Sequence, residues 1–238
     1  MIEGWTQREH PKRIVLEGNY CILEPLSSIH ENDLYQSLLS EESRFQYLPD
    51  YPYSSRDVFD MWMKTAVHSD DPLFFSVVDK SSGQAGGRQS LMSIVPEVSY
   101  TTLSYVRCIE YIIQHGVIEI GHILWSSKIA RTRVATESIF LMLRYAFDHL
   151  GYRRVEWKCN NENEPSKRAA LRFGFTFEGV FRQHRVVKGH NRDTAWFSLL
   201  DKDWPVVKQA MTLWLEESNF DISGQQMYSL SSFYSDHT

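Results

Sequence analysis

The segment Thr136–Leu150 constrains the fold most, because its apolar residues recur at the spacing of one helix face. This stripe consists of Ile139, Met142, Leu143, Ala146 and Leu150. Gly151 follows and is a natural residue to end a helix. Two strand-like segments flank the helix. Val117–Trp125 is rich in β-branched residues, and apolar residues alternate in Arg153–Cys159.

The rest of the chain predicts further strands and helices around this centre. Strands are expected at Ile14–Leu26, Phe74–Asp79 and Gly87–Val95, and a hairpin at Phe177–Val187 and Thr194–Leu200 around the turn Lys188–Asp193. Helices are expected from Ser28 to about Leu39 behind a capping box at Ser28–Glu31, from Ser54–Asp57 onward, from Asn163 to Gly174, and over Pro205–Glu217. This order predicts one α/β domain with a mixed sheet.

The domain should occupy residues 13–217, after an N-terminal arm of residues 1–12. We expect residues 218–238, which are polar and rich in serine, to be a disordered tail. No apolar run approaches the roughly 18 residues that a membrane span needs, and the first residues lack a signal-peptide core.

Charge and cysteine content narrow the class of protein. The formal net charge of −5 argues against a nucleic-acid partner, whereas it does not repel a cationic amine. Cys21, Cys108 and Cys159 lie far apart without metal-type spacing, so we expect reduced thiols, no metal and a cytoplasmic location. The sequence leaves the oligomeric state open.

Three segments carry residues suited to chemistry. Glu119-Ile120-Gly121-His122 lies in a strand, residues 130–137 (ARTRVATE) enter the long helix, and Asn163-Glu164-Pro165-Ser166 begins a short helix that ends at Phe173-Gly174-Phe175. With these motifs, the stretch from Gly116 to about Trp204 resembles the GCN5-related N-acetyltransferase (GNAT) superfamily, in the branch of the ribosomal-protein N-terminal acetyltransferases. The resemblance begins near Lys12, since the first strand is also similar. It implies a mixed, mostly antiparallel central sheet flanked by helices, and transfer of an acetyl group from acetyl-coenzyme A to an amine.

The resemblance places the coenzyme at the start of the long helix. Unpaired N–H groups and the dipole at a helix N-terminus suit a pyrophosphate. The family's loop reads Gln/Arg-x-x-Gly-x-Gly/Ala, and Ala130, Arg133 and Ala135 occupy those positions here, so the usual glycine is missing. The expected coenzyme contacts are Arg131, Thr132, Arg133, Val134, Ala135, Thr136, Asn163, Ser166 and Arg168. Alternatively, the segment is only a helix start with solvated arginines.

Two residues are the candidate catalytic groups. An amine with a pKa near 10 must lose a proton before it attacks, and the departing thiolate benefits from a proton donor. Glu119 is the candidate base, acting through water. Ser166 matches the serine that this branch uses as the acid. The tyrosine that serves as the acid in much of the superfamily is absent, since Ala170 stands at its position. Each residue also has a structural alternative, as a hydrogen-bonded strand glutamate or a first-turn helix serine.

The acceptor, a small-molecule amine or a peptide N-terminus, is expected near the first two helices. Tyr47 and Asp50 are the candidate contacts there, with His122 from the central strand and His184 from the last hairpin. Core packing is the alternative for the surrounding aromatic residues and for His122. A catalytically silent acyl-coenzyme A sensor of the same fold also stays open, because the missing glycine favours it.

Residues 98–114 form an atypical insert relative to the family pattern. They are rich in tyrosine, isoleucine and threonine and contain no glycine, proline or asparagine. The insert starts with Val-Ser, as GTAAGT translates, and ends with Gln, as CAG translates. One hypothesis is a retained in-frame intron, which implies a eukaryotic source; the other is an extra helix or strand. The intron hypothesis expects GT at codon 98 and AG at the end of codon 114.

Overall fold

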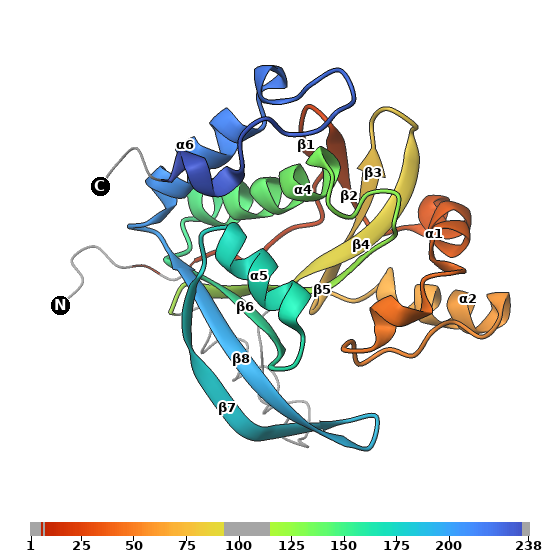
Figure 1. Cartoon of the computed structure of the whole chain (residues 1–238). Coiled ribbons are helices and arrows are strands. Elements are labelled where there is room, and N and C mark those ends of the chain that lie inside the picture. The colour runs from red at the N-terminus through yellow and green to blue at the C-terminus, as the bar shows by residue number, and fades with distance from the viewer. Residues whose placement is uncertain (1–5, 7, 93–114, 235–238) are drawn as a thin grey trace. The chain divides into compact units, whose positions relative to one another are not determined.

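The computed structural model describes residue 6, residues 8–92 and residues 115–234 (Figure 1). Its strands form an eight-stranded sheet in the order β1-β2-β3-β4-β5-β6-β8-β7. The pair β5/β6 is parallel, whereas β1/β2, β2/β3, β3/β4, β4/β5 and β7/β8 are antiparallel. The predicted α/β class, with a mixed and mostly antiparallel sheet flanked by helices, is confirmed. The chain divides into two compact units, residues 1–156 and residues 157–238, where a single domain over 13–217 was expected.

The first unit holds the strands from β1 to the start of β6. Their bounds are β1 (Leu16–Glu17), β2 (Cys21–Pro25), β3 (Leu73–Asp79), β4 (Gln84–Met92), β5 (Val117–Trp125) and β6 (Arg154–Asn160). The prediction for β5 is confirmed at both ends. The single strand expected over Ile14–Leu26 is wrong, because the chain turns between Glu17 and Cys21.

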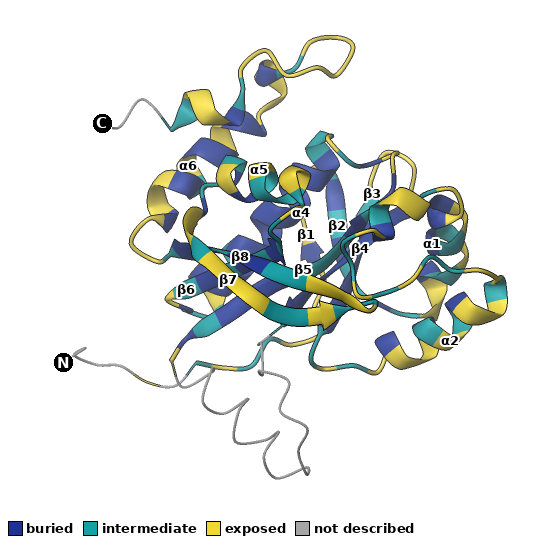
Figure 2. Ribbon diagram, turned by 60° about the horizontal axis from the view of Figure 1, so that its bottom comes forward, coloured by how far each residue is buried: buried dark blue, intermediate teal, exposed yellow. Residues whose placement is uncertain are grey.

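Helix α4 (Arg133–Arg144) begins three residues before the predicted start and continues as a π-helical turn over Tyr145–His149. It is buried over all its residues from Val134 to Leu143, as Figure 2 shows. Because α4 begins at Arg133, Glu137 lies in its second turn. Burying this carboxylate is favourable only if its oxygens are hydrogen-bonded.

The partners of Glu137 are the backbone N–H groups of the β1–β2 turn. Those of Asn19, Tyr20 and Cys21 each donate to its carboxylate over 2.7 Å. A Cβ atom at Gly18 would come within 2.4 Å of the same carboxylate, so only glycine fits there. This contact explains why the predicted first strand is interrupted.

Helices cover both faces of β4, as two consecutive residues show. Arg88 places its guanidinium 4.4 Å from the ring centre of Trp62 in α2 (Arg56–Ala66). Gln89 points the opposite way and exchanges hydrogen bonds of 3.1 Å with Ser138 of α4. Helix α1 (Glu31–Leu38) packs on the same face of the sheet as α2. The core cluster on this face consists of Leu26, Leu34, Phe59, Met63, Ala66, Phe74 and Ala85.

The capping box before α1 lies one residue earlier than predicted. Ser27 is the N-cap of the 3-10 turn Ser28–His30, and its N–H donates to His30 Nδ1 over 3.3 Å. The other ring nitrogen of His30 contacts Glu24 over 2.7 Å. The buried ring of His30 thus completes the capping box, a role that the sequence analysis gave to the side chain of Glu31.

The strands on either side of the unusual insert pair directly with each other. Met92 at the end of β4 lies opposite Glu119 in β5, and Leu91 lies opposite Ile120. The last residues of the strand predicted over Gly87–Val95, and the insert itself, lie outside the described residues.

The second unit contains the rest of β6, α5 (Glu164–Arg172), β7 (Thr176–Val187), β8 (His190–Leu200) and α6 (Trp204–Trp214). The hairpin turn is tighter than the predicted Lys188–Asp193, because β8 already begins at His190. Lys188 and Gly189 both adopt positive φ, which lets two residues reverse the chain.

The segment after α6 is folded rather than disordered. Its short 3-10 turns are Glu217–Asn219 and Leu230–Phe233, and Leu230 is fully buried. Asn219 holds the segment, since its side chain donates to the carbonyl of Trp214 and accepts from the N–H of Tyr228. The predicted disorder is wrong for residues 218–234, because composition does not reveal these contacts.

Candidate active site

Glu119 lies in the middle of the first unit, on β5. Its side chain is buried, with 5% of the residue exposed. Its Cα partners are Met92 on β4 and Glu156 on β6, so the three side chains share one face of the sheet. A Cβ atom at Gly121 would meet Met92 Sδ at 2.7 Å, so glycine lets these side chains occupy the space beside Glu119.

Glu156 is a candidate site residue that the sequence reasoning missed. Its carboxylate accepts from Arg154 Nε over 2.7 Å, and its side chain is 14% exposed. The signal was present in the sequence, because the buried alternation of Val155 and Trp157 places Glu156 on the opposite face. Glu119 and Glu156 therefore lie in register on neighbouring strands, with Arg154 compensating part of their charge.

His122 interrupts the regular geometry of β5. Its φ is 49°, in the left-handed region, and the register between β4 and β5 shifts at this point. Its ring packs edge-on against Phe74 with 5.4 Å between the ring centres. Packing therefore accounts for the ring, while the backbone forms a β-bulge.

Arg88 connects Asp50 to this bulge, because its guanidinium contacts both. Arg88 Nη2 forms an ion pair with Asp50 Oδ2, and Arg88 Nη1 donates to the carbonyl of His122 over 3.1 Å. Two predicted acceptor residues, Asp50 and His122, are thus brought together by an arginine that the sequence did not single out. Tyr47 lies three residues before Asp50 and is half-buried.

Among the aromatic residues around the first two helices, Phe45 is buried and Tyr53 and Trp62 pack against the core, whereas Tyr51 is exposed. Tyr53 packs edge-on against Phe45 and Phe59, with ring centres 5.3 Å and 5.0 Å apart. Burial raises the pKa of Tyr53, and the nearby positive charge of Arg88 opposes that shift. Trp62 continues the stack toward Phe74 over 5.7 Å.

The N-terminus of α4 is open at its first turn. Thr132 is the N-cap, but its hydroxyl donates backward to the carbonyl of Ile129 over 2.6 Å and does not cap the helix. Within the described part of the chain, the backbone N–H groups of Val134 and Ala135 have no recorded acceptor. Thr136 N–H bonds to the carbonyl of Thr132 over 3.3 Å.

Two arginines, Arg131 and Arg133, lie at the start of α4. Arg131 is exposed and adopts a φ of 66°, a conformation that usually favours glycine. Arg133, at the position of the family's glycine, begins the helix and places its guanidinium 4.5 Å from the ring centre of Tyr20. Positive charge and donor groups therefore lie together, as an anion requires.

In the second unit, Asn163 and Ser166 lie together at the start of α5. Asn163 Oδ1 accepts the N–H of Ser166 over 3.1 Å, so the predicted helix cap is confirmed. The Ser166 hydroxyl accepts the indole N–H of Trp157 over 3.0 Å. Burial raises the pKa of the Cys159 thiol, and a hydrogen bond with Ser166 opposes that shift.

Two further predicted residues of the second unit lie elsewhere. Arg168 is exposed on α5. His184 lies on β7, where its Nδ1 is 3.0 Å from Thr194 Oγ1 and its ring faces Phe181 and Trp196. Ala170 is fully buried, so the helix position used by a tyrosine in much of the superfamily belongs here to the core.

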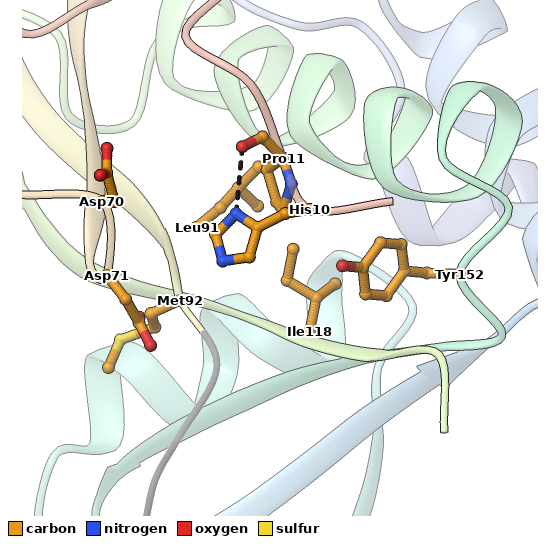
Figure 3. Close-up of a pocket in the computed structure, with 8 residues that line it drawn as sticks. All are labelled: His10, Pro11, Asp70, Asp71, Leu91, Met92, Ile118 and Tyr152. Atoms are coloured by element: carbon orange, nitrogen blue, oxygen red, sulfur yellow. Dashed lines mark hydrogen bonds between the residues drawn. The ribbon is translucent and has the colours of Figure 1, made fainter. Parts of the chain in front are cut away.

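A pocket of the first unit lies at the end of β4. It is lined by His10, Pro11, Asp70, Asp71, Leu91, Met92, Ile118 and Tyr152 (Figure 3). Ile118 lines this pocket, and the next residue, Glu119, points to the opposite face of β5. Met92, the cross-strand partner of Glu119, also lines the pocket.

The described residues contain no group of three or more His, Cys, Asp or Glu side chains placed to hold a metal ion. None of their helices combines the length and the apolar character required to cross a bilayer.

The acetyltransferase (GNAT) domain model matches residues 21–176, so the chain belongs to the GNAT acetyltransferase family. This confirms the predicted superfamily. An uncharacterized N-acetyltransferase of Bacillus licheniformis, p20, is 31% identical over 91 residues, which are 38% of this chain and 51% of p20. The chain thus matches about half the length of that curated relative.

Solved structures show the same fold. A GCN5-related N-acetyltransferase from Brucella melitensis has 50% identity and a TM-score of 0.88, over 98% of this chain and 99% of that one. RimL, a ribosomal L7/L12 α-N-protein acetyltransferase solved with coenzyme A, has a TM-score of 0.60 over 79% of this chain and 99% of its own. Its 19% identity supports the fold alone.

Proposed function

We propose that this protein transfers an acetyl group from acetyl-coenzyme A to a primary amine, in the cytoplasm. The single observation that carries the proposal is the hydrogen bond from Trp157 Nε1 to the hydroxyl of Ser166. An N–H aimed at the hydroxyl oxygen stabilises the negative charge that this oxygen gains on giving up a proton. Ser166 is thereby suited to protonate a departing thiolate.

Glu119 is the proposed base for the amine. Glu119 lies opposite Glu156 on β6, and Arg154, which pairs with Glu156, brings a positive charge to these strands. Because its side chain is buried, a water molecule is the natural relay between Glu119 and the amine.

Acetyl-coenzyme A supplies the activated acetyl group. The N–H groups of Val134 and Ala135, with the charges of Arg131 and Arg133, fit its pyrophosphate. Thr132 and Thr136 border the same turn. Asn163 and Arg168 are the proposed contacts from α5, to the pantetheine arm and to a phosphate respectively.

The proposed acceptor is a peptide N-terminus or a small-molecule amine. Tyr47, Asp50 and His122 are the proposed acceptor contacts in the first unit, and His184 stays a candidate contact from the sequence. RimL acts on a ribosomal protein, which makes a peptide N-terminus one member of the test panel. A polyamine, an amino acid and an aminoglycoside complete the panel.

The test is thiol release from acetyl-coenzyme A in the presence of each amine. We expect release with at least one class of amine, and Glu119→Gln should change the acidic limb of its pH profile. The reason is that activity which depends on an ionised carboxylate falls as that carboxylate is protonated. An unchanged acidic limb would remove Glu119 as the base.

The alternative is a silent domain that binds acyl-coenzyme A without turnover. Arg133 in place of the family's glycine favours it, because a side chain at this position limits how closely the backbone approaches a ligand. Stabilisation by acetyl-coenzyme A without thiol release from any amine would support this alternative.

A further inference from the structure

Arg88 is a buried cation that the proposed chemistry does not use. Its side chain is fully buried in β4. A buried charge is costly unless it is paired and hydrogen-bonded. Here the guanidinium contacts the carboxylate of Asp50, the carbonyl of His122 and the ring of Trp62.

These contacts join three segments that are distant in the sequence. Asp50 belongs to the loop of residues 46–55, Trp62 to α2, and His122 to the bulge in β5. Arg88 itself lies in β4, 38 residues from Asp50 and 34 from His122. One planar group with several fixed donors can serve all of these partners at once.

Stability alone is a poor explanation for such an arrangement. A buried ion pair is often no more stabilising than apolar residues of the same volume, whereas it does fix geometry. The geometry fixed here is that of Asp50. Its side chain is 24% exposed, and only Oδ2 is engaged, because no hydrogen bond to Oδ1 is recorded among the described residues.

We infer that Arg88 is a positioning residue, which holds the Asp50 carboxylate so that Oδ1 accepts a hydrogen bond from an N–H group of the acceptor. The inference rests on the proposed function and identifies the acceptor as a molecule with an N–H donor besides the reacting amine. Asp50 lies in the loop of residues 46–55 and the proposed base Glu119 lies in β5, so this second donor is separate from the reacting nitrogen. A peptide or a polyamine carries such a donor, and a simple monoamine does not.

Kinetics with matched variants test the positioning role. Arg88→Lys keeps the charge but cannot reach Asp50 and His122 together while stacking on Trp62. With the panel amine that gives the most thiol release, we expect Arg88→Lys and Asp50→Asn each to raise the acceptor KM about tenfold and to change kcat less than threefold. Arg56→Lys is the control, since Arg56 also pairs with carboxylates, Glu31 and Asp60, but is 40% exposed.

Substrate length gives a second kinetic measurement. Spermidine and butylamine differ in the additional N–H groups, so Asp50→Asn should reduce kcat/KM for spermidine and leave that for butylamine unchanged. A fall in kcat with unchanged KM, or an equal loss for both amines, would overturn the inference.

Hydrogen exchange separates this inference from the proposed function. In Arg88→Lys, peptides from residues 46–55 should exchange faster than in the wild type, while peptides from α4 should not change. If no panel amine is acetylated, the proposed function fails, and exchange then decides the positioning role by itself. Unchanged exchange over residues 46–55 in both Arg88→Lys and Asp50→Asn would show that Arg88 does not hold the loop.

Discussion

The N-termini of α4 and α5 differ in whether the N–H groups of the first turn have hydrogen-bond acceptors. In α5, Glu164 N–H bonds to the carbonyl of Glu162, Pro165 has no N–H, and Ser166 N–H bonds to Asn163 Oδ1. The next N–H, from Lys167, bonds to the carbonyl of Asn163. Every N–H group of the first turn of α5 thus has an acceptor within the protein.

In α4 the residue at the cap position turns its hydroxyl away. Thr132 donates to Ile129 instead of accepting from the helix, and no acceptor is recorded in the described chain for Val134 and Ala135 N–H. Buried backbone donors are costly when they stay unpaired. Asn163 thus fixes the first turn of α5 at Ser166, whereas the first turn of α4 has donors that the proposed coenzyme site would use.

The largest expected effect concerns the N-terminus of α5, where the N–H groups have acceptors. Ser166→Ala removes the hydroxyl but keeps the N–H that Asn163 accepts, so α5 should still fold. Loss of a general acid lowers the rate about 10² to 10⁴-fold, and we expect kcat in the thiol-release assay to fall in that range. Ser218→Ala, at an exposed serine, is the control. A wild-type kcat for Ser166→Ala would assign Ser166 to the helix alone.

The next effect concerns coenzyme binding at the N-terminus of α4, the open terminus. A hundredfold excess of acetyl-coenzyme A over its dissociation constant should stabilise the wild type by about 2.7 kcal/mol, seen as a higher Tm. Thr132→Asp should reduce this shift, because its carboxylate would cap α4 and repel the phosphates. The same substitution should raise the Tm without coenzyme. A full coenzyme shift in Thr132→Asp would place the phosphates elsewhere.

A smaller effect distinguishes the two caps in the free protein. Asn163→Ala leaves the Ser166 N–H without its acceptor, and loss of such a cap costs about 1 kcal/mol. Chemical denaturation without coenzyme should show this as a lower midpoint with an unchanged slope. Stability equal to the wild type would mean that α5 does not depend on Asn163.

The smallest effect is expected for Thr132→Ala. Its hydroxyl caps no N–H group of α4, so the substitution should change the free energy of unfolding by less than about 0.5 kcal/mol. Measured beside Asn163→Ala under the same conditions, it gives the contrast directly. A loss as large as that of Asn163→Ala would contradict the open terminus.

Local patterns in the sequence predicted much of this molecule. The alternation in β5 and β6, the apolar stripe of α4, and Asn163 before Glu164-Pro165 each involve residues within a few positions of one another. Such patterns act through backbone geometry and short-range hydrogen bonds, so they can be read along the chain. The motifs around them were sufficient to predict the family.

The folded chain alone decided which distant groups meet. Glu137 accepts from N–H groups 116 to 118 residues away, and this contact divides the first strand. Arg88 reaches Asp50 across 38 residues and turns an ordinary strand arginine into part of the candidate acceptor site. Neither contact leaves a periodic signal, because a hydrogen bond between distant segments depends on the sheet register and helix packing that bring them together. The sequence therefore determined the elements and the family, and the tertiary structure determined the partners of the buried charges.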